Sequence, residues 1–441
     1  MERLLMDDLV IWKNKKRRKP LIIHGARQVG KTWIMKEFGS RYFEKTIYIS
    51  FDNNEHMKNV FDMDYDTGRI ISAIKIEAAE NFTAKNTLLI FDEIQEVPRA
   101  LTSLKYFCEN APEYYIIAAG SLLGMALHEG TSFPVGKVDF LTLYPMNFKE
   151  FLLAAGEKQL ADLLTRQDYG LINSFSARYA DLLRRYYYVG GMPEAVRCCM
   201  EEDDLTAVRE IQKELLQYYE NDFSKHAPKE QMPRIRMVWN SIPAQLAKAN
   251  RKFIYGIVRE GARAKDFEMA IQWLNDYGLV MKSYRIRKPG MPLIAYMEQN
   301  SFKLFMMDIG LLAAKVNLSA KVLLEGNQIF EEFKGALTEQ FIAQQLHSQN
   351  TELYYYSTEN SSGEIDFVIQ REQYCIPIEV MAEENLRARS LRAYCLKYKP
   401  EIAIRSSMSN YREQDWMINV PLYALAEFLN AEFLNRHGET D

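Results

Sequence analysis

The chain has 441 residues, 48% of them hydrophobic and 26% charged, and its formal net charge at pH 7 is −4. This length exceeds one ordinary core, so two or three domains are expected, and the charge excludes a protein that is basic over its whole surface. The five cysteines and six histidines show neither disulfide nor zinc spacing. We find no signal peptide and no apolar run of about 18 residues. A cytoplasmic protein with reduced thiols and no membrane partner is therefore expected.

The first motif in chain order is GARQVGKT, which follows a short apolar strand at residues 21–24 and precedes a helical pattern. It matches G-x-x-x-x-G-K-[ST], whose glycines let backbone N–H groups point at phosphate oxygens. In such loops the lysine reaches the β- and γ-phosphates and the hydroxyl ligates Mg²⁺. The nucleotide-binding residues expected here are Gly25, Ala26, Arg27, Gln28, Val29, Gly30, Lys31 and Thr32.

A second apolar strand at residues 88–91 delivers Asp92 and Glu93 at its carboxyl end, where ligands bind in parallel sheets. We expect Asp92 to hold Mg²⁺ through water and Glu93 to polarise the attacking water. A third strand, residues 114–119, leads to Ser121, which either senses the γ-phosphate or caps the next helix. No Asn-Lys-x-Asp base-reading motif is present, so ATP is favoured over GTP.

Alternating strands and helices predict an α/β fold with a parallel, doubly wound sheet. GARQVGKT, LLIFDE, IIAAGS and PVGKVDFLTLYPMNFKEFL resemble the prokaryotic AAA-type ATPases that carry a carboxy-terminal domain of unknown function with a nuclease-like fold. The resemblance extends over nearly the whole chain and implies an AAA/STAND-type P-loop domain. Members often have arginine where this chain has Lys137, which keeps the charge but loses the bidentate fork.

Four domains are expected: an ATPase domain (1–155), a helical linker or lid (156–230), a winged-helix-like domain (231–325) and a nuclease-like domain (326–441). The Gly190–Gly191 break is read either as a turn joining domains or as a hinge. Arg285, Arg287 and Lys288 are expected near the tip of the wing. The segment DFEMAIQWLNDYG is rich in acids, which phosphate would repel, so a lid or protein contact is favoured over DNA reading.

The last 116 or so residues, in the order helix–strand–strand–strand–helix, resemble the PD-(D/E)XK nuclease core. Strand alternation predicts that Asp366 and Glu379 face the same way and share Mg²⁺, with Glu339 from the helix completing the oxygen shell. The lysine expected two residues after Glu379 is absent, because Met381 stands there. Arg387 or Arg389 is the alternative cation. These residues are therefore interpreted as a degenerate nuclease site.

Three functional hypotheses follow. The first is a slow Mg²⁺-dependent ATPase, with Lys31 and Glu93 as catalytic residues, that acts as a nucleotide-driven switch. The second is an active, ATP-regulated nuclease, and the third is an ATP-sensing interaction protein without turnover. Expected partners are ATP, Mg²⁺, and DNA or another protein bound through the winged-helix and carboxy-terminal modules, with oligomers allowed.

Overall fold

The computed structural model describes residues 1–120, 134–248, 250–325, 331–358, 363–382 and 388–430. The chain forms two compact units. The amino-terminal unit comprises Glu2–Tyr144 with Asp276–Gly278, and the carboxy-terminal unit comprises Pro145–Asn275 with Leu279–Asp441. The residues expected to form the linker, winged-helix and nuclease-like domains therefore belong, with few exceptions, to one compact unit.

The amino-terminal unit is built on a parallel sheet with the order β2-β3-β4-β1-β5. Its strands are β1 (Leu21–His24), β2 (Lys45–Ser50), β3 (Thr87–Asp92), β4 (Tyr115–Ala119) and β5 (Asp139–Thr142). Strand β3 is buried along its whole length, as expected for a strand covered on both faces. Strand β4 pairs in parallel with both β1 and β3. The segments that follow these three strands therefore leave the sheet at the same edge. The predicted α/β class is confirmed.

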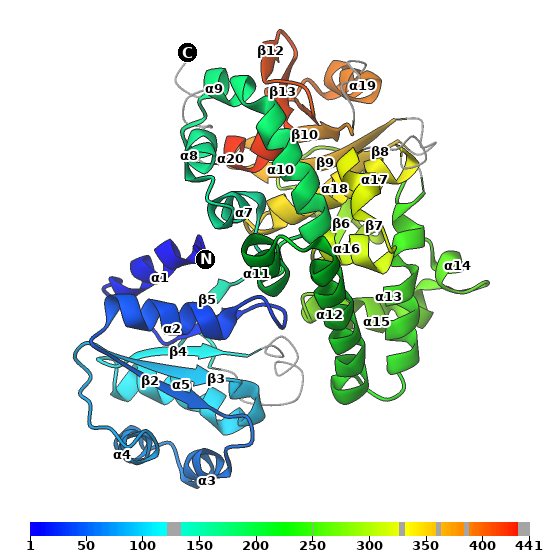
Figure 1. Ribbon diagram of the computed structural model, residues 1–441. Coiled ribbons are helices and arrows are strands. Elements are labelled where there is room, and N and C mark those ends of the chain that lie inside the picture. The colour runs from blue at the N-terminus through cyan, green and yellow to red at the C-terminus, as the bar shows by residue number, and fades with distance from the viewer. Residues whose placement is uncertain (121–133, 249, 326–330, 359–362, 383–387, 431–441) are drawn as a thin grey trace. The chain divides into compact units, whose positions relative to one another are not determined.

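Helices cover both faces of this sheet (Figure 1). They are α1 (Leu5–Lys13), α2 (Lys31–Tyr42), α3 (Glu55–Met63), α4 (Thr67–Glu77) and α5 (Pro98–Asn110). One face packs against α3, α4 and α5 through a large apolar cluster that includes Phe61, Ile74 and Phe107. The other face packs against α1 and α2, where Trp12 contacts Phe38 and Tyr115. Because helices cover both faces of a parallel sheet, the arrangement is doubly wound.

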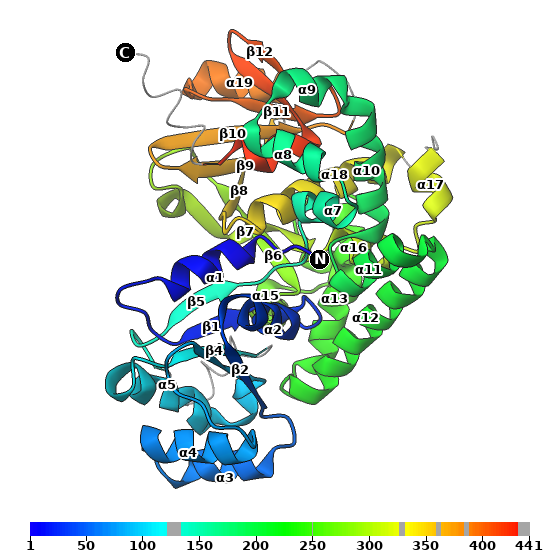
Figure 2. The same ribbon diagram turned by 60° about the vertical axis from the view of Figure 1, so that its left-hand side comes forward.

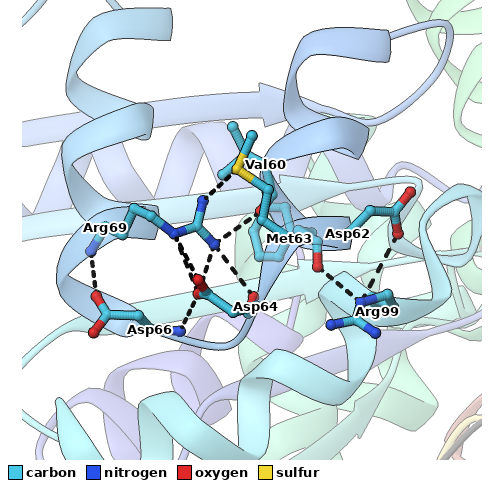
Figure 3. Close-up of polar contacts among 8 residues, drawn as sticks. Val60, Asp62, Met63, Asp64, Asp66, Arg69 and Arg99 are labelled. Atoms are coloured by element: carbon cyan, nitrogen blue, oxygen red, sulfur yellow. Dashed lines mark hydrogen bonds and ion pairs between the residues drawn. The ribbon is translucent and has the colours of Figure 1, made fainter.

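The connection between α3 and α4 is held by Arg69 (Figure 3). Its guanidinium forms an ion pair with Asp64 at 2.6 Å and donates to the Val60 carbonyl at 3.1 Å. Arg99 of α5 donates to the Phe61 carbonyl nearby at 2.9 Å. The Asp64 pKa is lowered by the hydrogen bond from Arg69. This contact is largely exposed, so it contributes little to stability and serves to order the turn.

The carboxy-terminal unit begins with consecutive helices and then forms a mixed sheet (Figure 2). Its helices are α7 (Phe148–Ala154), α8 (Lys158–Arg166), α9 (Tyr169–Ser174), α10 (Ser176–Val189), α11 (Pro193–Glu202), α12 (Leu205–His226), α13 (Met232–Leu246), α14 (Tyr255–Val258), α15 (Ala264–Asp276), α16 (Ile309–Lys315), α17 (Ala320–Glu325), α18 (Glu331–His347), α19 (Arg389–Tyr398) and α20 (Leu425–Phe428). Over the described ranges of both units, no helix is long and apolar enough to cross a membrane.

The sheet of this unit has eight strands in the order β12-β13-β11-β10-β9-β8-β6-β7. They are β6 (Val280–Ile286), β7 (Met297–Met306), β8 (Leu353–Ser357), β9 (Glu364–Arg371), β10 (Tyr374–Val380), β11 (Ile404–Ser407), β12 (Arg412–Gln414) and β13 (Met417–Pro421). The hairpin β6–β7, expected as a wing, is thus part of the same sheet as the strands expected in the nuclease-like domain. It joins them because β6 pairs in parallel with β8.

The basic residues expected at the tip of the wing are engaged within this sheet. Arg285 pairs with Glu298 at 3.1 Å and donates to the Ser357 carbonyl at 2.7 Å. Arg287 pairs with the same glutamate, also at 3.1 Å. The Glu298 carboxylate therefore pairs with two guanidinium groups, which reduces the positive charge at this end of the β6–β7 hairpin.

The Gly190–Gly191 turn is clamped inside the carboxy-terminal unit. Gly190 has φ +71°, and a Cβ there would lie 2.3 Å from Asp308 Oδ1. The Gly191 N–H donates to Asp308 Oδ2 at 2.6 Å, and Gln344 Nε2 donates to the same oxygen at 3.0 Å. Burial raises the pKa of Asp308. The turn is therefore held by buried hydrogen bonds within the carboxy-terminal unit.

Candidate functional site

The loop that follows β1 has the backbone of a phosphate cradle. Gly25 has φ +145°, and a Cβ there would lie 2.2 Å from the Leu143 carbonyl oxygen, so only glycine fits. Gly30 has φ 96° and caps the start of α2 without a side chain. The first turn of α2 therefore presents free N–H groups, where a helix attracts anions.

Lys31 lies folded back onto this loop and is only 7% exposed. Its ammonium donates to the carbonyl oxygens of Gly25 and Ala26, both at 2.8 Å. Burial lowers the pKa of Lys31 to about 8, although the nearby carboxylates Glu93 and Asp92 oppose the shift. Two carbonyl oxygens arranged around one ammonium mark a position that strongly favours a cation, and a phosphate could replace them as partner.

Thr32 and Asp92 meet at the edge where the sheet strands end. Thr32 Oγ1 donates to Asp92 Oδ2 at 2.6 Å, and Tyr48 of β2 donates to the same oxygen at 3.0 Å. Burial, with the charge of Asp92, raises the pKa of Tyr48 to about 12. Thr32 and Asp92 are 60 positions apart in the sequence. A hydroxyl and a carboxylate side by side are oxygen ligands of the kind that Mg²⁺ prefers.

Glu93 adopts a backbone conformation that is uncommon for a residue with a side chain. Its φ of 52° and ψ of 43° are left-handed, a conformation that clusters at functional sites. The Glu93 carboxylate accepts a hydrogen bond from Gln95 Nε2 at 2.5 Å. The turn redirects Glu93 away from the line of β3 while Asp92 stays buried at its end.

Two further sequence predictions concern residues near this edge. Ser121 lies outside the described residues. Lys137 forms an exposed ion pair with Glu109 at 2.8 Å, and this pairing raises the pKa of Lys137. The lysine is therefore bound to a surface carboxylate of its own unit.

Arg3 is a residue that sequence reasoning missed. It is buried, and its guanidinium donates to the Val29 carbonyl at 2.8 Å and to the Tyr144 carbonyl at 2.6 Å. It thereby ties the phosphate loop to the chain that follows β5. Nothing in the sequence around Arg3 signals this role, because its partners are 26 and 141 positions away.

We expect Arg3→Ala to weaken ATP binding about three- to tenfold although Arg3 contacts no phosphate. The reason is that two carbonyl groups lose a charged donor, worth roughly 1.5–3 kcal/mol each to the fold, and only part of this reaches the loop. Titration with a fluorescent ATP analogue measures the effect. Arg41→Ala, an exposed arginine of α2, is the matched control, and equal affinities for the two variants would contradict the role of Arg3.

The carboxy-terminal unit contains a second cluster of charged side chains. Lys303 of β7 is completely buried and its ammonium lies 2.5 Å from Glu364, 3.3 Å from Glu339 and 3.9 Å from Asp366. Arg251 forms an ion pair with Glu339 as well. The pKa of Asp366 is raised well above its usual value by burial and by the neighbouring Glu339. Sequence reasoning did not single out Lys303, Arg251 or Glu364 for this cluster.

Glu379 lies apart from this cluster. A register shift in the β8–β9 pairing leaves Ile365 and Val368 on the face that packs against α19, whereas Phe367 contacts Phe305 on the other face. Phe367 pairs with Ile378, so Glu379, one residue further along β10, faces α19.

The surroundings of Glu379 agree with that placement. Burial raises the pKa of Glu379 to about 7, against opposing effects of Arg405 and the Leu391 N–H. The structure brings Glu339 and Asp366 together and puts Glu379 on the opposite face of the sheet. As arranged, no three His, Cys, Asp or Glu side chains in the described parts of the chain could hold a metal ion.

Three family models match consecutive parts of the chain. Residues 17–152 match an AAA domain, residues 180–322 match a Domain of unknown function (DUF8612), and residues 334–425 match a Domain of unknown function (DUF4143). The amino-terminal unit therefore resembles an AAA-type P-loop domain, as its sequence predicted. No curated protein matches the chain.

Several solved structures match the chain at low identity. The Walker-type ATPase PABY2304 of Pyrococcus abyssi is 14% identical, with a TM-score of 0.43, and the match covers 71% of this chain and 95% of that one. The Aeropyrum pernix ORC2 protein in its ADP form is 14% identical, with a TM-score of 0.30 and coverages of 77% and 95%. Drosophila ORC bound to DNA is 13% identical, with a TM-score of 0.26 and coverages of 67% and 89%.

Proposed function

We propose that this chain is an ATP-binding protein that slowly hydrolyses ATP with Mg²⁺ and uses the nucleotide state as a switch. The observation that carries the proposal is the 2.6 Å contact between Thr32 Oγ1 and Asp92 Oδ2. It joins the hydroxyl of the phosphate loop to the carboxylate at the end of β3. An AAA-type domain with this pair in place has the two oxygen groups needed for a metal beside the phosphates.

The residues around this edge fit ATP and Mg²⁺. The backbone of residues 25–30 and the start of α2 would hold the phosphates, and Lys31 would turn from its two carbonyl partners to the β- and γ-phosphates. Thr32 and Asp92 would hold the metal, which supplies charge neutralisation at the transferring phosphoryl group. Tyr48 keeps Asp92 oriented through its own hydrogen bond.

Glu93 is the proposed residue that positions and polarises the attacking water. It follows the buried Asp92 directly, and its left-handed backbone turns it out of the strand. Hydrolysis of this kind is slow without an added arginine. Faster hydrolysis would need an arginine supplied by another subunit.

ATP binding provides the direct test. We expect Lys31→Ala to weaken the binding of a fluorescent ATP analogue by about ten- to a hundredfold, because a charge-assisted hydrogen bond to phosphate is worth roughly 1.5–3 kcal/mol. Lys58→Ala, which removes a half-exposed lysine of α3 in the same unit, is the control and should bind normally. Unchanged binding by Lys31→Ala would refute the proposed phosphate loop.

For the carboxy-terminal unit we propose a binding role without nucleic-acid cleavage. Two observations support it. Glu379 accepts a hydrogen bond from the Leu391 N–H of α19, on the other face of the sheet from Asp366, and Lys303, which lies 3.9 Å from Asp366, is completely buried. The rival is a metal-dependent nuclease that is regulated by ATP. Cleavage of DNA or RNA with Mg²⁺ or Mn²⁺ that is lost in Asp366→Asn would favour the rival.

A protein partner is favoured over DNA for the middle of the chain. Helix α15 carries Asp266, Glu268 and Asp276, which would repel phosphates. The arginines of β6 and its end are paired with Glu298. This surface is therefore proposed to contact another protein or to act as a lid.

A further inference from the structure

We infer that Lys303 occupies a cation site of the carboxy-terminal unit with its own ammonium group, at the position where a divalent metal ion would otherwise bind among Glu339, Glu364 and Asp366. The chain thereby supplies its own cation, and the unit keeps its fold without a metal. This inference is independent of ATP binding and hydrolysis by the amino-terminal unit.

The geometry around the ammonium carries the inference. Three carboxylates from two elements converge on Lys303 Nζ: Glu339 from α18, and Glu364 and Asp366 from β9. Glu364 and Asp366 reach the same side because they are two residues apart on a strand. Lys303 reaches these acids from β7, and its side chain has no exposed surface. The ammonium is thus enclosed by oxygen atoms and is out of reach of solvent.

Burial explains why a cation is needed at this position. Glu339 is also almost completely buried, and carboxylates brought together in such a place repel one another unless a positive charge lies between them. Arg251 pairs with the other carboxylate oxygen of Glu339, whereas Lys303 forms ion pairs with all three acids. The site is therefore defined by the Lys303 ammonium together with the three acids around it.

The chemistry of the site fits a hard divalent ion once the lysine is removed. All three acids are oxygen ligands, which Mg²⁺, Ca²⁺ and Mn²⁺ prefer. Metal–oxygen distances of roughly 2.0–2.6 Å are shorter than most of those to the ammonium, so the acids must move inward by about 1 Å to bind a metal. Glutamate side chains on α18 and at the start of β9 can make that movement by changing rotamer.

The test is a search for a new metal site in a lysine-free variant. Full-length Lys303→Met is compared with wild type, both in an Asp92→Asn background that removes the proposed metal ligand of the nucleotide site. Mn²⁺ binding is followed by electron paramagnetic resonance, and thermal unfolding is followed with and without Mn²⁺. We expect at least about a tenfold gain in Mn²⁺ affinity, because affinity rises with the charge of the ligands left free.

Two further variants make each outcome decisive. Lys303→Met with Glu339→Gln and Asp366→Asn should lose the gained Mn²⁺ binding, which would locate it at this cluster. Lys303→Met with Glu364→Gln carries one acid fewer, so it should fold more readily and still bind Mn²⁺. Recovery of folding of Lys303→Met by Mn²⁺ would also support the inference.

Three outcomes would overturn it. The first is that the folded lysine-free variants bind Mn²⁺ no better than wild type. The second is that neither Lys303→Met nor Lys303→Met with Glu364→Gln folds with or without Mn²⁺, because a metal then cannot replace the ammonium. The third is that wild type itself binds Mn²⁺ at this cluster, since the lysine would then not occupy the position.

Discussion

Glu93→Gln is expected to lower the rate of ATP hydrolysis by about 10²–10³-fold while ATP binding is retained. A glutamine has the size of a glutamate but cannot accept the proton of the attacking water, and general-base catalysis is worth about 10²–10⁴-fold. Binding should persist because the phosphate loop and Asp92 are untouched. Phosphate release over time and titration with a fluorescent ATP analogue, carried out on the same preparation, separate the two effects.

The matched control for this experiment is Glu96→Gln, which changes an exposed glutamate of the short 3₁₀ helix Ile94–Glu96. It should hydrolyse ATP at the wild-type rate. If wild type binds ATP but releases no phosphate, and Glu93→Gln is indistinguishable from it, the chain senses ATP without turnover. If Glu93→Gln hydrolyses ATP as fast as wild type, Glu93 is not the base.

Lys303→Met should lower the free energy of unfolding of the carboxy-terminal unit by about 3–5 kcal/mol, measured without added metal. Removing one partner of a buried ion pair leaves uncompensated charge, and this is the cost seen in such cases. Here Glu339 keeps only Arg251 as an ion-pair partner, and Glu364 loses its 2.5 Å contact. Urea unfolding followed by tryptophan fluorescence measures the change, since Trp239, Trp273 and Trp416 belong to this unit.

Lys252→Met is the control, because Lys252 is exposed and its backbone bridges to Lys303 in the neighbouring strand. Its effect should stay within about 0.5 kcal/mol, as for most surface substitutions. A Lys303→Met variant as stable as this control would mean that the ammonium does not neutralise the carboxylates. The cation assignment would then fail together with this prediction.

The sequence by itself determined the amino-terminal unit. The phosphate loop lies in one short stretch of sequence, which contains the strand at residues 21–24, Gly25, Gly30, Lys31 and Thr32. Local spacing therefore defines the loop before any tertiary contact is known. The strand at residues 88–91 is apolar throughout, and it ends in two acids that a parallel sheet must deliver to the same edge. Local patterns of this kind predicted the parallel α/β sheet, the family resemblance of this part and the nearness of Thr32 to Asp92.

Only the tertiary structure decided the long-range pairings. Arg3 reaches the phosphate loop, and Lys303 reaches Glu339 and Glu364, through contacts that no local pattern encodes. The β6–β7 hairpin joins the larger sheet because of its pairing with β8. Strand alternation put Asp366 and Glu379 on one face, and a single register shift in β9 was enough to separate them. The face of the sheet on which a side chain lies depends on the pairing register of its strand. One extra residue in a strand therefore moves the side chains beyond it to the other face.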